Sequence, residues 1–171
     1  MNIYLNNSRN NVIGKLDVDY YVPVTIRFDQ NDKRPRNLLL YRIINSDSSL
    51  IEFSINSSNK KLVEITIVSI NNLKSKQITY VFPQNIKKDN PDFDISSFNN
   101  GNIVTENVEF KISAFENEIT LLFSMEDGVS TSVEMEHVIF LLDKQSQLIG
   151  LKFFGFSKEQ WEILCNSLKI Y

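Results

Sequence analysis

Alternation of apolar and polar residues with a period of two runs through most of this 171-residue chain. Alternate positions of residues 16–28 are apolar, and Pro23 interrupts the run, which predicts either one long strand or two strands broken at Pro23. The same pattern marks residues 51–55, 63–67, 108–112 and 119–123. Because successive side chains of a strand point to opposite faces, these segments are expected to be half-buried antiparallel strands.

The last part of the chain carries a different period. Ser157 and Gln160 have the spacing of a helix capping box. Behind them Trp161, Leu164, Cys165 and Leu168 form an apolar stripe with helical spacing. We therefore predict a C-terminal helix that packs on the sheet, with Trp161 as a core anchor.

The expected fold class is α+β, predominantly antiparallel β, with about 9–11 strands and this single helix. Residues 1–171 are long enough for one compact domain. Within it, residues 50–71 can be laid over residues 137–157 with one gap, so that Phe53 meets Phe140. This predicts a duplicated β-meander with halves 1–88 and 103–171 joined by residues 89–102. The competing interpretation is that any two hairpins with alternating residues look alike.

Composition restricts the class of protein. No apolar run reaches the roughly 18 residues of a membrane span, and the N-terminal residues do not have the pattern of a signal peptide. The single cysteine, Cys165, excludes an internal disulfide framework. A cytoplasmic protein is expected.

Charge is distributed unevenly along the chain. Residues 1–88 hold thirteen Lys and Arg against seven Asp and Glu, whereas residues 89–137 hold eleven acids and one base, Lys111. A concentrated acidic field attracts basic surfaces and repels nucleic acid. The modest formal net charge of −3 hides this asymmetry.

The acidic segment supplies the candidate binding residues for a basic partner. On strands the polar positions share a face, so Glu134 and Glu136 are expected to project together, and so are Glu116 and Glu118 if the strand includes them. Neighbouring strands could assemble all of them into one negative patch, whose mutual repulsion a basic partner would relieve. The candidate partner-binding residues are Glu106, Glu109, Glu116, Glu118, Glu126, Asp127, Glu134 and Glu136. The alternative is a solvated acidic face.

Catalytic, metal and cofactor sites are not expected. The chain has one histidine, His137, which alternation places in a strand beside Val133 and Met135, and one cysteine, Cys165, which lies on the apolar helix stripe. No cluster has zinc-ligand spacing, and no phosphate-binding loop or nucleophile elbow is present. We therefore predict neither a catalytic residue nor a metal ion nor a cofactor.

Two further segments were considered as ligand sites. Asp92, Asp94 and Ser96 could occupy the first positions of a calcium loop, but the required Gly is Ser97 and the closing Glu is Ile103, so an acidic surface loop is preferred. Residues 33–36 form a small basic cluster that could grip phosphates. A solvated turn is the favoured interpretation, because no aromatic platform accompanies the three charges.

In size, β-rich pattern, acidic segment and lack of catalytic groups, the chain resembles a bacterial immunity protein of contact-dependent inhibition and other polymorphic toxin systems. The resemblance implies a non-catalytic protein that binds and neutralises a cognate toxin domain, often a nuclease with a basic cleft. It implies no binding of nucleic acid or membrane. Phe93, Phe98 and Phe115 flank the acidic residues and are candidate anchors, each with a core position as the alternative.

Two other functions stay open. One is an assembly module whose oppositely charged halves pair between protomers, which makes self-association sensitive to salt. The other is an enzyme that uses a pair of carboxylates, for example on glycosides. The second is disfavoured, because no groove of aromatic and polar residues surrounds the acids.

Overall fold

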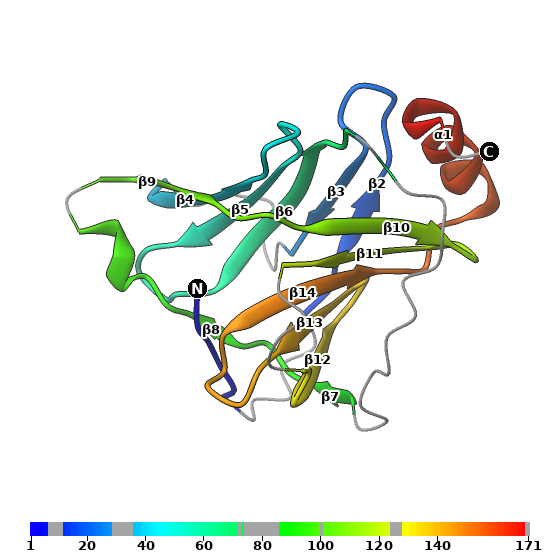
Figure 1. Ribbon diagram of the computed structural model, residues 1–171. Helices are drawn as coiled ribbons and strands as arrows, with labels where there is room; N and C mark the ends of the chain where they lie inside the picture. The colour runs from blue at the N-terminus through cyan, green and yellow to red at the C-terminus, as the bar shows by residue number, and fades with distance from the viewer. Residues whose placement is uncertain are drawn as a thin grey trace.

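A computed structural model describes residues 1–6, 12–28, 36–71, 73, 86–99, 101–123 and 128–169. Two six-stranded sheets face each other, and one helix, α1, lies beside them near the C-terminus (Figure 1). The first sheet has the order β2 (Lys15–Asp17), β3 (Val24–Arg27), β6 (Leu62–Ser69), β5 (Leu50–Asn56), β4 (Leu38–Ile44), β9 (Ile103–Asn107). The second has the order β10 (Lys111–Phe115), β11 (Glu118–Leu122), β14 (Leu148–Phe153), β13 (Val138–Leu142), β12 (Thr131–Met135), β7 (Ile86–Lys88).

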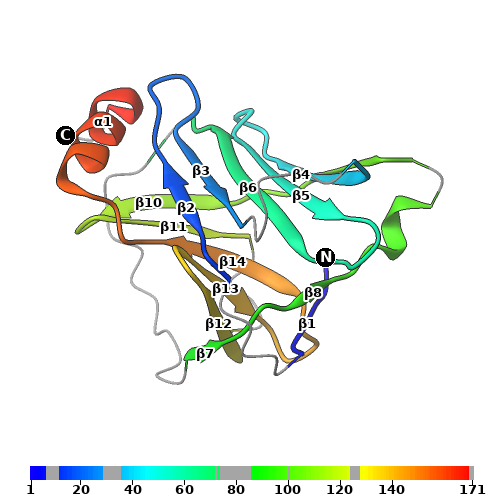
Figure 2. The ribbon, with the colours of Figure 1, turned by 180° about the vertical axis from the view of Figure 1, so that it is seen from behind.

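A two-stranded pair and two helical segments complete the described elements. β1 (Ile3–Tyr4) pairs antiparallel with β8 (Asp92–Phe93), as Figure 2 shows from behind. η1 (Ser96–Phe98) is a short 3-10 turn, and α1 spans Lys158–Leu168. The predicted α+β, mostly antiparallel fold with a C-terminal helix is confirmed. The described residues contain more strands than expected, because two- and three-residue strands such as β1, β7 and β8 are too short to show alternation.

Strands form where the alternation predicted them, with one informative difference. Of the two alternatives for residues 16–28, the structure has two strands, β2 and β3, and Tyr20 and Tyr21 lie exposed in the connection between them. The strand predicted at residues 108–112 begins only at Lys111, because residues 108–110 form a corner. There the chain leaves β9 in the first sheet and enters β10 in the second, as the green ribbon of Figure 1 shows. A strand that bends from one sheet to the other is the usual way to close such a corner.

The two sheets have matching strand orders. In the first sheet β4, β5 and β6 form a meander, and the preceding hairpin β2–β3 pairs with β6, the last of the three. In the second sheet β12, β13 and β14 form a meander, and the preceding hairpin β10–β11 pairs with β14. The register agrees as well, since Phe53 lies opposite Ile65 in the first sheet and Phe140 opposite Leu151 in the second. Such agreement is what a duplication would leave, although common ancestry of the halves stays a prediction.

The central segment of the chain belongs to both sheets. β7, which comes before the predicted connector, is parallel to β12 in the second sheet. β9, which comes after it, is parallel to β4 in the first sheet. Each predicted half therefore contributes an edge strand to the other half's sheet, and separating the halves would expose both edges.

The larger of two apolar clusters among the described residues joins the two sheets. It contains fully buried side chains from both, among them Phe53 and Phe140, and Phe140 packs edge-to-face on Phe93 with ring centroids 5.6 Å apart. Leu164 of α1 joins the same cluster.

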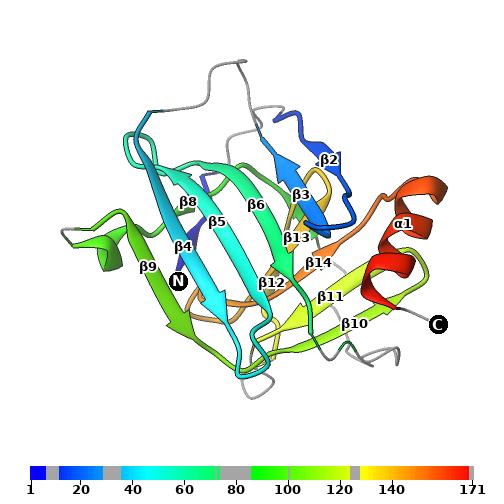
Figure 3. The same cartoon turned by 90° about the horizontal axis from the view of Figure 1, so that it is seen from above.

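The helix begins as the sequence predicted. Ser157 accepts a hydrogen bond from the Gln160 backbone, and the Gln160 side chain accepts one from the Ser157 backbone. The Gln160 amide also donates to the Leu16 carbonyl, which places α1 against β2, the edge strand of the first sheet (Figure 3). Trp161 is half-buried and packs on Phe156, so it anchors the helix without being fully enclosed. In the described part of the chain, no helix is both long and apolar enough to cross a membrane.

Because side chains of both sheets share one core, we expect the two sheets to unfold in a single transition. Phe53→Ala and Phe140→Ala should each lower the free energy of unfolding by about 3–5 kcal/mol, because each empties a fully enclosed site. Both should shift one common transition, measured by far-UV circular dichroism and by fluorescence of Trp161, the only tryptophan. Ile13→Ala is the control, since that side chain is 76% exposed and its loss should change stability by no more than about 0.5 kcal/mol. Two separable transitions would show that the sheets fold independently.

Candidate functional site

The six predicted acidic residues that the structure describes have different surroundings. Glu126 and Asp127 lie outside the described residues. The other six divide into three groups by their surroundings: two are paired with lysines on a sheet face, two lie in exposed hairpin turns, and two lie on or just after β9.

Glu118 and Glu134 lie on the outer face of the second sheet, and each is neutralised within the chain. The Lys152 ammonium is 2.7 Å from the Glu118 carboxylate, and the Lys88 ammonium is 3.1 Å from the Glu134 carboxylate. Register explains the second pair, because β7 lies beside β12 with Lys88 opposite Glu134. The repulsion expected between these acids is therefore relieved by the protein's own bases.

Glu116 and Glu136 lie in two-residue turns and not on strands. Glu116 and Asn117 join β10 to β11, and Glu136 and His137 join β12 to β13. Both glutamates have positive φ, 48° in each case, which ends the alternation of side chains along a strand. The predictions that Glu134 and Glu136, and Glu116 and Glu118, project together from strands are therefore wrong, as is the placement of His137 in a strand.

The two turns lie at the same end of the second sheet. β14 separates the β10–β11 hairpin from the β12–β13 hairpin, so the midpoints of the two turns are three strand spacings apart, about 14 Å. The chain leaving β14 runs between them, where the Asn117 side chain donates to the Phe156 carbonyl and the Phe154 backbone donates to the His137 carbonyl. Both turns are therefore held on one rigid support.

An exposed aromatic ring adjoins these turns. Phe115 is 41% exposed at the end of β10, directly before Glu116. Phe93 and Phe98 are core residues instead, with 0% and 5% exposure, which excludes them as anchors on the folded surface. We call Phe115, Glu116 and Glu136 the sheet-end surface. Within the described residues, neither of its carboxylates has a salt-bridge partner.

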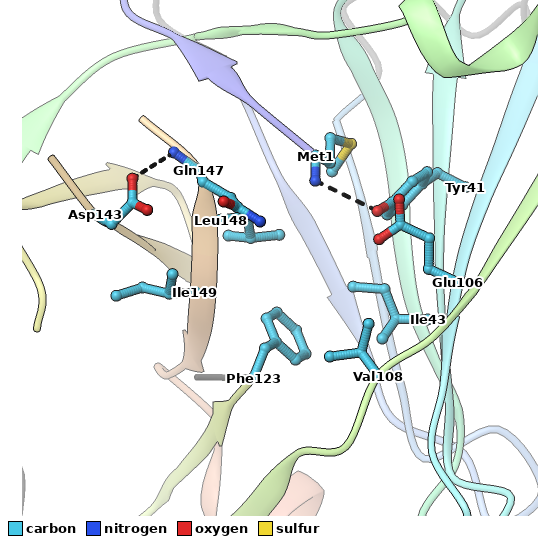
Figure 4. Close-up of a pocket in the computed structure, with 10 residues that line it drawn as sticks. All are labelled: Met1, Tyr41, Ile43, Glu106, Val108, Phe123, Asp143, Gln147, Leu148 and Ile149. Atoms are coloured by element: carbon cyan, nitrogen blue, oxygen red, sulfur yellow. Dashed lines mark hydrogen bonds between the residues drawn. The ribbon is translucent and has the colours of Figure 1, made fainter. Parts of the chain in front are cut away.

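The remaining two acids have separate roles. Glu109 is exposed, and its carboxylate accepts a hydrogen bond from the Ser46 backbone at 2.9 Å. Glu106 on β9 is half-buried and lines a cavity of about 170 Å³. This cavity lies where β4 and β9 of the first sheet face the β13–β14 hairpin of the second (Figure 4).

One side of the cavity is polar and the other is apolar. The apolar side is formed by Ile43, Val108, Phe123, Leu148 and Ile149. The polar side is formed by Met1, Tyr41, Glu106, Asp143 and Gln147. The N-terminal ammonium of Met1 donates to the Tyr41 hydroxyl at 3.4 Å, and that hydroxyl is also hydrogen-bonded to Glu106. Burial first, and then the hydrogen bond and charge of Glu106, raise the pKa of Tyr41 far above its ordinary value, so the hydroxyl stays protonated.

Sequence reasoning identified Glu106 but not the cavity. Tyr41 follows three leucines on an alternating strand, which is the pattern of a core residue, and its ring is in fact buried with 1% exposure. Nothing local indicates that its hydroxyl meets a carboxylate 65 positions further along the chain.

The segment considered as a calcium loop contains a lysine contact instead. The Lys61 ammonium lies 3.0 Å from an Asp92 carboxylate oxygen and donates to the Asn90 carbonyl at 2.5 Å. The described residues contain no group of three or more His, Cys, Asp or Glu side chains placed to hold a metal ion. Although burial, the largest influence, favours the neutral acid, hydrogen bonds from Lys61 and Asn6 together with the lysine charge lower the pKa of Asp92.

The other candidates occupy unremarkable surroundings. Cys165 is half-buried on α1, and burial followed by the Glu162 charge raises the pKa of its thiol, which disfavours the thiolate. The His137 ring nitrogen lies 3.3 Å from the Phe154 carbonyl. Of the basic cluster at residues 33–36, only Arg36 is described, and it is exposed.

The Lys61–Asp92 contact predicts a pH dependence of stability. Because folding lowers the pKa of Asp92 from 3.8, the contact stabilises the fold above that pH and is lost as the pH falls through the folded-state value. Asp92→Asn should therefore reduce the free energy of unfolding at pH 7, and the difference from the wild type should shrink below about pH 3.8. Urea denaturation between pH 2 and 7 measures this, with Asp47→Asn as an exposed control. An equal deficit at every pH would contradict the assignment.

The described site residues offer two features for binding, the sheet-end surface and the cavity. Neither contains a catalytic triad, a phosphate-binding loop or a ring of metal ligands among the described residues. Comparison of the chain with protein-family models and with curated proteins finds no match. The function is therefore argued from surface chemistry and geometry.

Proposed function

We propose that this protein is a non-catalytic immunity protein that acts in the cytoplasm and neutralises a cognate toxin domain. The toxin would be bound at the sheet-end surface. The partner is a protein domain with a basic surface, such as the substrate cleft of a nuclease. A blocked cleft excludes substrate, so neutralisation needs no chemistry from the immunity protein.

The observation that carries the proposal is the contrast between the paired and the unpaired acids. Glu118 and Glu134 have lysine partners on the same sheet, whereas Glu116 and Glu136 lie in two turns at the same end of that sheet and have no salt-bridge partner among the described residues. Charges that stay unpaired in the folded chain are available to a basic partner.

Phe115 supplies the apolar contact that charges alone do not provide. Exposed charges mainly increase the association rate and fix the register of a complex, whereas affinity concentrates in a few buried aromatic anchors. Phe115 stands beside Glu116 with 41% of its surface exposed, so a partner could bury it while meeting both carboxylates. The rigid support from β14 reduces the ordering that binding would require.

Self-assembly through oppositely charged halves is less well supported. Lys61 and Lys88 of the basic segment already pair with Asp92 and Glu134 of the acidic segment within one chain. Those charges would have to leave an intramolecular partner before meeting one on another protomer. No observation favours the carboxylate-pair enzyme.

Charge reversal at the two turns tests the proposal. The protein is co-expressed with the product of the adjacent gene, and association is measured at several salt concentrations. Glu116→Lys with Glu136→Lys should lower the association rate at low salt by at least about tenfold, and the loss should shrink as added salt screens the charges. Phe115→Ala should instead mainly increase the dissociation rate.

Asp47→Lys is the matched control, because it reverses an exposed acid in the β4–β5 turn of the other sheet and should leave association unchanged. Glu134 is avoided, since its reversal would also break the pair with Lys88. Unchanged kinetics in the double variant would remove the sheet-end surface from the interface. Failure of the neighbouring gene product to bind the wild type at all would count against the immunity function itself.

A further inference from the structure

We propose that the cavity between β4, β9 and the β13–β14 hairpin binds an alkylammonium group, with Asp143 as its direct acceptor. The group could belong to a free small amine or to a lysine side chain of another protein, because both present the same ammonium on a short hydrocarbon chain. This inference is independent of the sheet-end surface and of the toxin partner.

Asp143 is built into the cavity wall with one carboxylate oxygen to spare. The residue is only 6% exposed. Its Oδ1 accepts hydrogen bonds from the backbones of Gln145 and Gln147, both at 2.8 Å, which fixes the side chain in the hairpin turn. Within the described residues Oδ2 has no partner, and Figure 4 shows the carboxylate on the wall opposite Tyr41. Oδ2 is not among the fully enclosed atoms of the described residues, so it can accept a hydrogen bond from a donor that enters the cavity.

The matching hairpin of the first sheet shows that the turn itself does not need this charge. There Asn56 occupies the equivalent position, and its Oδ1 accepts from the Ser58 backbone at 2.9 Å. An amide therefore serves the turn as well as a carboxylate does. The negative charge of Asp143 is an additional property, and it faces the cavity.

The rest of the cavity specifies the ligand as a cation with a short apolar chain. Glu106 adds a second carboxylate, and the protonated Tyr41 hydroxyl to which it is bonded holds it in place. The two carboxylates outnumber the one positive charge of the lining, the Met1 ammonium, and this net negative charge favours a positively charged guest over a neutral or negative one. Ile43, Val108 and Phe123 form the apolar floor on which methylene groups would pack. A volume of about 170 Å³ admits a chain of only a few carbon atoms.

Titration calorimetry with n-butylammonium chloride tests the site directly on the whole protein. Saturable binding with a dissociation constant of about millimolar order is expected for so small a ligand. n-Butanol, which has the same chain without the charge, should bind at least about tenfold more weakly, and sodium butyrate should not bind. No saturable binding of butylammonium at millimolar concentrations, or equal binding of butanol, would overturn the proposal.

Two isosteric variants identify the acceptors. Asp143→Asn keeps the Oδ1 contacts of the turn and should weaken butylammonium binding by at least about tenfold, since a hydrogen bond to a charged group is lost. Glu106→Gln can keep its bond to Tyr41 and should weaken binding less, because only a supporting charge is removed. Asp47→Asn should have no effect. Unchanged affinity in Asp143→Asn, with an unchanged melting temperature, would exclude Asp143 as the acceptor.

A second ligand distinguishes the sources of the ammonium. Nα-acetyl-lysine N-methylamide presents the same group on a peptide backbone. Binding equal to that of butylammonium would support a lysine side chain as the guest, whereas binding of butylammonium alone would support a free amine. Both results uphold the alkylammonium site, and neither depends on whether a toxin binds at the sheet-end surface.

Discussion

Burial of one face of each sheet against the other is the interaction on which the rest of the structure depends. A six-stranded sheet with an apolar face cannot remain in water, and here each sheet uses the other as its cover. The exchanged edge strands add to this constraint. β7 and β9 come from the same short stretch of chain but pair with different sheets, so the two layers are tied at their edges as well as through the core. The β1–β8 pair is bonded to one hairpin of each sheet. The Ile3 backbone donates to the Ser146 carbonyl in the β13–β14 turn, and the Phe93 backbone donates to the Lys60 carbonyl in the β5–β6 turn.

The exchange of edge strands between the halves also explains why the uneven charge along the sequence does not become an equally uneven charge in space. β7 carries Lys88 from the basic segment to Glu134 in the acidic one, and the β5–β6 hairpin brings Lys61 to Asp92. Ion pairs of this kind contribute little to stability when they are exposed. Their consequence here is for recognition: they remove acids from the surface that a partner would meet and leave Glu116 and Glu136 as the distinctive charges.

Local patterns predicted what local interactions determine. The capping box of Ser157 and Gln160 and the alternating strands at residues 51–55 and 63–67 depend on near neighbours, and the structure confirms them. The turns containing Glu116 and Glu136 were missed because neither has the Asn-Gly or Asp-Gly pair that usually marks a two-residue turn. The pairing of Lys88 with Glu134 depends on a parallel contact between strands 46 positions apart, which no local pattern encodes. The contact of Tyr41 with Glu106 likewise arises from a long-range parallel pairing, that of β4 with β9.

The corner between β9 and β10 connects the fold to the cavity. A strand that belongs to the first sheet up to Asn107 and to the second from Lys111 must bend away from both, so side chains near the bend cannot fill the space between the layers completely. Val108 lies at this bend, and Glu106 lies two residues before it. Polar groups are tolerable there because the cavity opens between the layers rather than inside the core. The equivalent hairpin residue of the first sheet is Asn56, which does not line this cavity, whereas the hairpin that lines it carries Asp143. The negative charge of Asp143 therefore lies where a ligand could reach it. Packing alone does not require this difference between the two hairpins.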